Sequence, residues 1–155
     1  MTPAVDVVRR AKIPFTLHQY NHDPTVASYG EEAADSLGLP REQVFKTLVV
    51  DIGGNNLVVA IVPVSSSLNL KKLARAAGVK RAKMAVATAV ERSSGYVLGG
   101  VSPLGQKRKL PTFVDSSAKK LLCVYVSAGR RGLEIALAPT DLLTLTRAEY
   151  FELSE

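Results

Sequence analysis

The chain has 155 residues, of which 46% are hydrophobic and 22% are charged, a composition that excludes a fibre, a coiled coil and a disordered chain. Its one cysteine, Cys123, excludes an internal disulfide and a cysteine-rich zinc site, and no apolar run reaches the roughly 20 residues that span a bilayer. The net charge of +6 comes from 20 basic against 14 acidic residues. Because the N-terminus also lacks a signal peptide's apolar segment, we expect a single cytoplasmic domain over residues 1–155.

The first elements are short and clearly bounded. A helix begins at Thr2, followed directly by a proline, and stops before Pro14. Phe15–Tyr20 has the composition of a strand. Ser28–Glu31 has capping-box spacing and opens a helix that Gly38 closes.

A hairpin and an amphipathic helix follow. Val44–Ile52 and Leu57–Val62 are apolar, β-branched runs, and the Gly-Gly-Asn-Asn sequence between them tolerates positive φ, so they predict a β-hairpin. In Leu70–Ala77 the apolar residues recur at helical spacing, and Gly78 ends the helix.

The second half of the chain begins with another capping box, Thr88–Glu91, which predicts a short helix that stops at Gly95. Three strands are expected, at Thr112–Asp115, Leu121–Val126 and Leu133–Ala138. A final helix starts at Pro139. The order lacks regular βαβ alternation, which favours an α+β fold around a largely antiparallel or mixed sheet.

The positive charge is concentrated in residues 71–109, where ten basic side chains stand against one acid, Glu91. This third of the chain carries +9 and the remainder −3, as expected of a surface that meets a polyanion such as nucleic acid. The alternative is that these basic side chains simply lie on the solvent-exposed face of a helix and bind nothing. Tyr96 is the only aromatic residue in the segment, so phosphate contact is favoured over base stacking.

Gly99–Pro111, with the sequence GGVSPLGQKRKLP, is the most unusual segment. Glycines allow backbone N–H groups to approach a ligand closely, and proline stiffens the turn, so the loop could present fixed donors to a carbonyl or phosphate oxygen. The alternative is a tight structural connection. Lys46, at the start of an apolar strand, suits an anionic ligand atom unless it simply reaches solvent.

Conventional catalytic groups are not evident. Ser102 lacks the second glycine of a nucleophile elbow, and the proline after it would remove a needed amide donor. His18, His22 and Asp23 could be drawn as a metal site, but their stretch alternates like a strand rather than a helix. Cys123 lies in an apolar strand, where a buried thiol is expected. We therefore expect no metal and no cofactor.

Two linked motifs, VFKTLV at residues 44–49 and the glycine-rich loop Gly99–Pro111, resemble the YbaK family of aminoacyl-tRNA deacylases. These are relatives of the editing domain inserted in bacterial prolyl-tRNA synthetases. The resemblance covers nearly the whole chain, and the SPLGQK form is similar to the Cys-tRNA deacylase branch. It implies a barrel-like central sheet flanked by short helices.

The resemblance also implies roles for residues. Lys46 would contact the backbone at the acceptor end of tRNA, while the amides around Gly100 and Val101 would hold the ester carbonyl. The aminoacyl pocket would be lined by Tyr20, Tyr29, Thr47, Ser102, Pro103 and Asp141. Tyr29 stands where the family has phenylalanine. The tRNA backbone would meet Lys71, Lys72, Lys107, Arg108 and Lys109.

In the family that the chain resembles, no protein side chain attacks the ester. The thiol of the substrate cysteine attacks its own carbonyl, forms a thiolactone and releases tRNA. The implied function is a trans-acting deacylase that clears Cys-tRNA(Pro), with prolyl-tRNA synthetase as a candidate partner. Two alternatives stay open: water-mediated hydrolysis of Ala- or Ser-tRNA, and a tRNA-binding module without catalysis.

Overall fold

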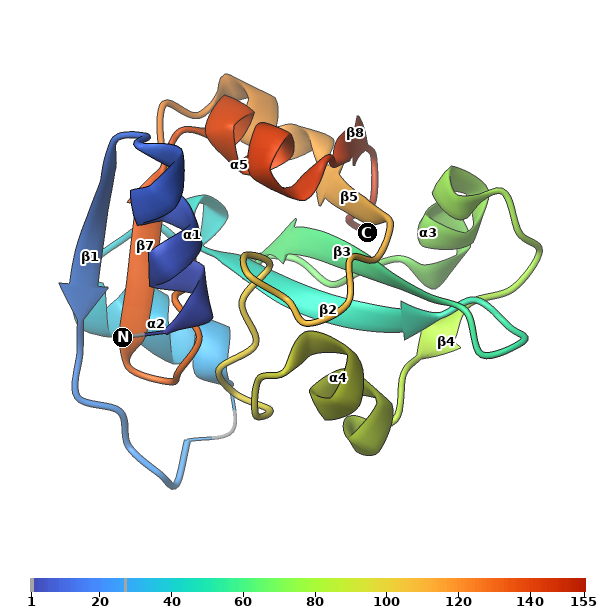
Figure 1. Cartoon of the computed structure of the whole chain (residues 1–155), viewed down its shortest axis with the longest axis horizontal. Coiled ribbons are helices and arrows are strands. Elements are labelled where there is room, and N and C mark those ends of the chain that lie inside the picture. The colour runs from blue at the N-terminus through green and yellow to red at the C-terminus, as the bar shows by residue number, and fades with distance from the viewer. Residues whose placement is uncertain (1, 27) are drawn as a thin grey trace.

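The structure is a computed structural model that describes residues 2–26 and 28–155 (Figure 1). Its α-helices are α1 (Pro3–Ala11), α2 (Tyr29–Leu37), α3 (Leu70–Ala77), α4 (Ala87–Ser94) and α5 (Pro139–Thr146). Its strands are β1 (Phe15–Gln19), β2 (Phe45–Asp51), β3 (Leu57–Pro63), β4 (Lys83–Met84), β5 (Thr112–Asp115), β6 (Val124–Ser127), β7 (Leu133–Leu137) and β8 (Glu149–Phe151). No helix of the described residues is long and apolar enough to cross a membrane.

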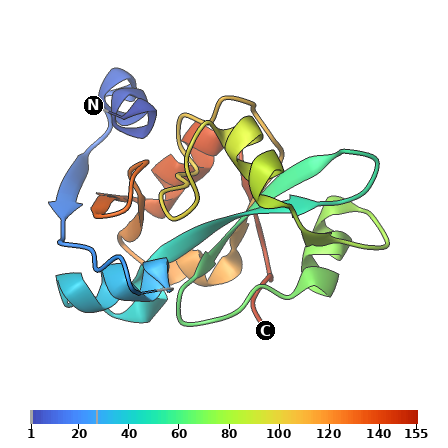
Figure 2. The ribbon, with the colours of Figure 1, turned by 90° about the horizontal axis from the view of Figure 1, so that it is seen from below.

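The predicted hairpin β2–β3 is confirmed and forms the centre of a five-stranded sheet. The sheet has the order β4-β2-β3-β5-β8, with β3, β5 and β8 parallel to one another and the other pairs antiparallel. Side chains alternate between its faces, so Val49 and Ile61 enter one apolar cluster while Val50 and Ala60 enter another beneath α3. Figure 2 shows α3 at one end of this hairpin and α2 at the other.

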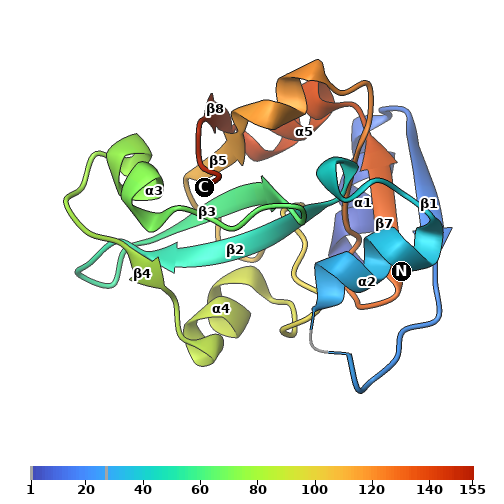
Figure 3. The same ribbon diagram turned by 180° about the vertical axis from the view of Figure 1, so that it is seen from behind.

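The second sheet is antiparallel, with the order β1-β7-β6. One face joins the largest core, which α1 and α5 also enter, and the other face is covered by α2 (Figure 3). A parallel bridge between Val44 and Tyr125 links the two sheets.

The α+β class is confirmed, but the expectation of a barrel is wrong. The five-stranded sheet ends at β4 and β8 and the three-stranded sheet at β1 and β6, so the strands do not form one closed ladder.

Three local expectations also need correction. Ser28 is the N-cap of α2, but its side chain makes no capping hydrogen bond. α4 begins at Ala87, one residue before Thr88, and its N-cap is Val86, so the predicted capping box of Thr88 and Glu91 is wrong. The Glu91 carboxylate instead accepts a hydrogen bond from the amide of Leu98 (3.2 Å). The strand expected from residue 121 starts only at Val124, because residues 121–123 form a bend between the 3-10 helix Ser116–Lys120 and the strand. β4 and β8 are two and three residues long, too short to show a periodic pattern.

Asp115, at the end of β5, ties the C-terminal segment to the sheet. Its carboxylate accepts hydrogen bonds from the amides of Leu153 (2.9 Å) and Ser154 (3.1 Å) and from the Ser117 hydroxyl (2.6 Å). Burial by itself would raise the pKa of Asp115, but these hydrogen bonds outweigh it and hold the pKa below its ordinary value. The ionised carboxylate therefore stabilises the folded chain.

Replacing Asp115 with asparagine should lower the free energy of unfolding by about 2 kcal/mol at pH 7, because charge-assisted hydrogen bonds are lost. The folded pKa lies below the unfolded value of about 3.9, so this stabilisation is complete above that value and disappears as the pH falls through the folded pKa. Urea unfolding at pH 7 and pH 3 measures the change. Glu149→Gln, which alters an exposed carboxylate on β8, is the control. An Asp115→Asn effect of equal size at both pH values would contradict the assignment.

Candidate functional site

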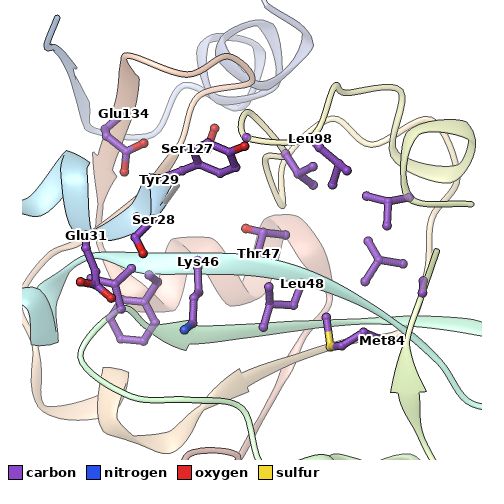
Figure 4. A pocket seen from close by; sticks show the side chains of 18 of the residues that line it. Ser28, Tyr29, Glu31, Lys46, Thr47, Leu48, Met84, Leu98, Ser127 and Glu134 are labelled. Atoms are coloured by element: carbon purple, nitrogen blue, oxygen red, sulfur yellow. The ribbon is translucent and has the colours of Figure 1, made fainter. Parts of the chain in front are cut away.

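A cavity of about 370 Å³ opens between β2, the N-terminal end of α2, the adjoining ends of β6 and β7, the glycine-rich loop and α4 (Figure 4). Of the residues assigned to catalysis or substrate binding, those that line it are Tyr20, Tyr29, Lys46, Thr47 and Val101. The structure therefore brings together side chains from segments far apart in the sequence.

Strand β2 supplies the floor of the cavity. Partial burial lowers the pKa of Lys46, while the carboxylate of Glu31 acts in the opposite direction by favouring the charged form. The hydroxyl oxygen of Thr47 is buried and has no hydrogen-bond partner among the described residues. Because buried polar atoms are normally paired, the Thr47 hydroxyl is available to a polar group of a ligand.

The ring of Tyr29 is held from two sides. The guanidinium of Arg131 lies 4.3 Å from the ring centroid, in cation–π contact. On the loop side, a Cβ added at Gly99 would come within 3.3 Å of the ring, so the absent side chain leaves room for it. Tyr29 is therefore fixed between the β6–β7 turn and the glycine-rich loop.

Arg131 was not singled out by the sequence, yet it organises this side of the site. It donates hydrogen bonds to the backbone oxygens of Asp23 and Val26 (both 2.8 Å) and forms an ion pair with Glu32 (3.1 Å). Glu32 in turn accepts from the amide of Asp23 (2.7 Å). The Arg131–Glu32 pair thus secures the segment that leads into α2. A Gly-Arg-Arg-Gly turn is the only sequence signal, and it does not reveal what the arginine contacts.

The glycine-rich loop packs against the same turn. A Cβ at Gly100 would lie 2.7 Å from the Cα of Arg130, so only glycine fits there without displacement. The Gly100 amide, expected to hold a substrate carbonyl, already donates to the carbonyl oxygen of Val97 (2.9 Å). Of the two assigned amides, only that of Val101 has no backbone acceptor within the described chain, so it is the candidate donor.

Three assigned pocket residues do not line the cavity. Ser102 is fully buried, and its hydroxyl accepts a hydrogen bond from the Leu104 amide (3.2 Å), so it shapes the loop. Pro103 lines a second hollow on the surface. Asp141 lies in the first turn of α5, where its negative charge suits the helix N-terminus.

The residues assigned to tRNA binding occupy different settings. Lys71, Lys107, Arg108 and Lys109 are exposed. Lys72 is engaged, since its ammonium donates to Glu152 (2.7 Å) and to the backbone oxygen of Ser154 (2.8 Å). Arg108 and Lys109 border the second hollow together with Arg147.

Glu134 is the cavity residue that the sequence analysis missed. It lies on β7 between His18 of β1 and Ser127 of β6, and its side chain faces the cavity (Figure 4). The residue is only 6% exposed, and burial raises the pKa of its carboxyl to about 8. The one sequence feature that could have indicated a buried acid is the single glutamate within the otherwise apolar strand LEIAL.

Other reactive arrangements are not found in the described part of the chain. No hydroxyl that lines the cavity is hydrogen-bonded there to a histidine, a lysine or a carboxylate. Residues 2–26 and 28–155 contain no group of three His, Cys, Asp or Glu side chains placed to hold a metal ion. His18 instead lies 2.8 Å from the Thr16 hydroxyl and packs edge-on against Tyr125.

Comparisons with known proteins agree with this geometry. The family model described as "Aminoacyl-tRNA editing domain" matches residues 23–145. A protein of Enterococcus faecalis named "Putative Cys-tRNA(Pro)/Cys-tRNA(Cys) deacylase EbsC" is 37% identical over 153 residues, which are 99% of this chain and 93% of that protein. A proline–tRNA ligase of Trichlorobacter lovleyi is 31% identical over 97 residues, 63% of this chain and 17% of that enzyme. A crystal structure described as "a putative trans-editing enzyme for prolyl tRNA synthetase" is 25% identical, with a TM-score of 0.81 over 100% of this chain and 99% of the other.

The buried carboxyl of Glu134 should make stability depend on pH. Its folded pKa of about 8 exceeds the unfolded value, so between about pH 4.3 and pH 8 the folded chain binds more protons at this group than the unfolded chain. The free energy of unfolding therefore falls as the pH rises through this range. Glu134→Gln removes this component, and its stability relative to the unsubstituted protein should increase from pH 5 to pH 8.

Urea unfolding at pH 5, 6.5 and 8 measures this difference, with Glu149→Gln as the exposed control. If the difference between Glu134→Gln and the unsubstituted protein does not vary with pH, Glu134 is not a buried, neutral acid at pH 7.

Proposed function

The chain belongs to the aminoacyl-tRNA editing domain family, as its two motifs predicted, and we propose that it is a trans-acting deacylase that removes cysteine from mischarged Cys-tRNA(Pro). The observation that carries the proposal is the cavity itself. It is lined by Lys46, Thr47 and Tyr29, and in the described part of the chain no hydroxyl at the cavity is paired with a base.

The proposed reaction uses the substrate's own thiol. The thiolate sulfur attacks the ester carbonyl carbon, the bond from that carbon to the ribose oxygen breaks, and the ribose oxygen takes up the proton that the thiol lost. The products are cysteine thiolactone and tRNA with a free terminal hydroxyl. Because nucleophile and carbonyl belong to one molecule, the protein mainly fixes their relative orientation, an effect worth about 7–11 kcal/mol in favourable intramolecular reactions.

Residues at the cavity have matching roles in this proposal. Lys46 attracts the phosphate backbone at the acceptor end, and the unpaired hydroxyl of Thr47 bonds a polar atom of the aminoacyl group. The Val101 amide, on a residue that lines the cavity, would donate to the developing negative charge on the carbonyl oxygen, where a preorganised donor is most effective. Tyr29, fixed by Arg131, forms the wall that limits the size of the amino acid.

The proposed partner is aminoacyl-tRNA in the cytoplasm. We further propose that the protein and this tRNA can form a ternary complex with prolyl-tRNA synthetase. The exposed basic residues Lys71, Lys107, Arg108 and Lys109 can meet phosphates of the tRNA body. Lys72, already paired with Glu152, is the weakest of the assigned contacts.

Turnover of tRNA(Pro) charged with cysteine, alanine or serine tests the function. We expect rapid deacylation of Cys-tRNA with a thiolactone that can be trapped, no deacylation after the substrate sulfur is alkylated, and slow turnover of Ser-tRNA, whose hydroxyl ionises far less readily than a thiol. Rapid hydrolysis of Ala- or Ser-tRNA without thiolactone from Cys-tRNA would establish water as the nucleophile. Binding of all three without turnover would establish a tRNA-binding module.

Lys46→Ala should reduce kcat/KM for Cys-tRNA(Pro) by about 10- to 150-fold, because a charge-assisted contact contributes about 1.5–3 kcal/mol. The matched control is Lys120→Ala, which removes an exposed lysine that does not line the cavity. Urea unfolding of both variants shows whether they are folded. Full turnover by folded Lys46→Ala would exclude Lys46 from the site.

A further inference from the structure

The glycine-rich loop lines two separate spaces. Gly99 and Val101 line the cavity of the candidate site, whereas residues 103, 105, 106 and 108–111 line the second hollow, which has a volume of about 460 Å³. Helix α1 contributes Val7 to this hollow, and the C-terminal end of α5 contributes residues 145–147. The hollow therefore borders the loop that carries the Val101 amide but shares no residue with the cavity.

Three cationic side chains line the hollow, and none of the described residues that line it is acidic. The cations are Arg108 and Lys109 of the loop and Arg147 at the end of α5. All three are exposed, and none forms an ion pair with a carboxylate of residues 2–26 and 28–155. Because like charges repel one another, an anion bound in the hollow would relieve their repulsion.

The loop is fixed where it borders the hollow. The amide of Arg108 donates a hydrogen bond to the carbonyl oxygen of Ser93 in α4 (2.9 Å). Gly105, with a φ of +68°, packs so closely against α1 that an added Cβ would lie 2.8 Å from the backbone of Pro3. The backbone that carries two of the three cations is thus ordered before a ligand arrives, which reduces the entropic cost of binding.

We propose that the second hollow, bordered by Arg108, Lys109 and Arg147, binds the phosphate backbone of the substrate tRNA. This inference rests on the proposed function, which requires tRNA but leaves open where its body lies on the protein. Two of the three cations are arginines, whose planar donor groups match the oxygens of a phosphate diester. Arg147 lies outside the basic segment 71–109, so the packing of α5 adds a cation that the charge pattern of the sequence did not include.

The lining suits a chain of phosphates better than one small anion. The cations come from two segments of the chain, and the hollow is larger than the cavity itself, so successive phosphates can meet different cations. Val7, Leu110 and Leu145 also line the hollow, and the carbon-bound hydrogens of the sugars between phosphates can contact such apolar side chains. With the aminoacyl end in the cavity, phosphate contacts on the same loop would hold the tRNA at a second point.

The salt dependence of binding to uncharged tRNA(Pro) tests this site. Over about 50–200 mM salt, Arg108→Gln and Arg147→Gln should each reduce the slope of log K against log salt concentration by about 0.7–0.9, because one phosphate contact is lost. Arg147→Lys should retain the slope. Lys120→Gln, which removes the same charge from an exposed position outside the hollow, is the matched control. An unchanged slope for Arg147→Gln, or an equal reduction for Lys120→Gln, would overturn the proposal.

Alkylation of a single thiol locates the contact. In a Cys123→Ser background, Pro111→Cys and Thr146→Cys each place the only thiol at the hollow, on two different segments, and Lys120→Cys places it outside. Urea unfolding shows which variants are folded. Saturating tRNA(Pro) should slow alkylation at positions 111 and 146 and leave position 120 unaffected. Equal rates with and without tRNA at the hollow, or protection by polyglutamate and not by tRNA, would contradict a phosphate site, and the latter would indicate an acidic polypeptide as the ligand.

Failure of this proposal and failure of the proposed function are distinguishable. If Cys-tRNA(Pro) is not deacylated but tRNA protects the thiols at the hollow, the proposed function falls and the phosphate site stands. If Cys-tRNA(Pro) is deacylated while tRNA protects neither thiol and the arginine variants keep the full salt slope, the deacylase stands and the hollow is not part of its tRNA-binding surface.

Discussion

The guanidinium of Arg131 is the interaction on which the site depends. It joins the β6–β7 turn to two backbone oxygens of the segment before α2, to Glu32 and to the face of Tyr29. The backbone of the same turn packs directly against Gly100, where a side chain would not fit. Three segments that are remote in sequence are therefore joined beside the cavity. In the proposed reaction this matters, because a reaction that depends on orientation requires the substrate to be held in one rotamer.

Two ionisable side chains of the cavity, Lys46 and Glu134, differ in how far they are buried, and their pKa values shift accordingly. Lys46 is partly buried, whereas Glu134 is almost completely buried, and desolvation there favours the neutral acid. A neutral carboxyl does not repel an approaching thiolate, and it retains both a donor and an acceptor for hydrogen bonds. In the proposed reaction, a neutral Glu134 would place no full negative charge beside the reacting sulfur.

Strand β2 contributes both of its faces to the cavity. Lys46 and Leu48 share a side with Val50, whereas Thr47 shares a side with Phe45 and Val49, because successive side chains of a strand point to opposite faces. Which side chains meet in the cavity therefore depends on how two sheets and the glycine-rich loop are placed together.

The sequence by itself determined the elements that depend on local patterns: the β2–β3 hairpin, the amphipathic α3, the α+β class, and the two motifs that place the chain in its family. Through that resemblance it also assigned Lys46, Thr47 and Tyr29 to a site, and all three line the cavity. Only the tertiary structure revealed Arg131 and Glu134, and only it showed that Ser102 and Asp141 lie away from the cavity. Hairpins and helices arise from periodicity within a short segment, whereas burial, a cation–π contact and the walls of a cavity depend on segments about a hundred residues apart, which no local pattern encodes.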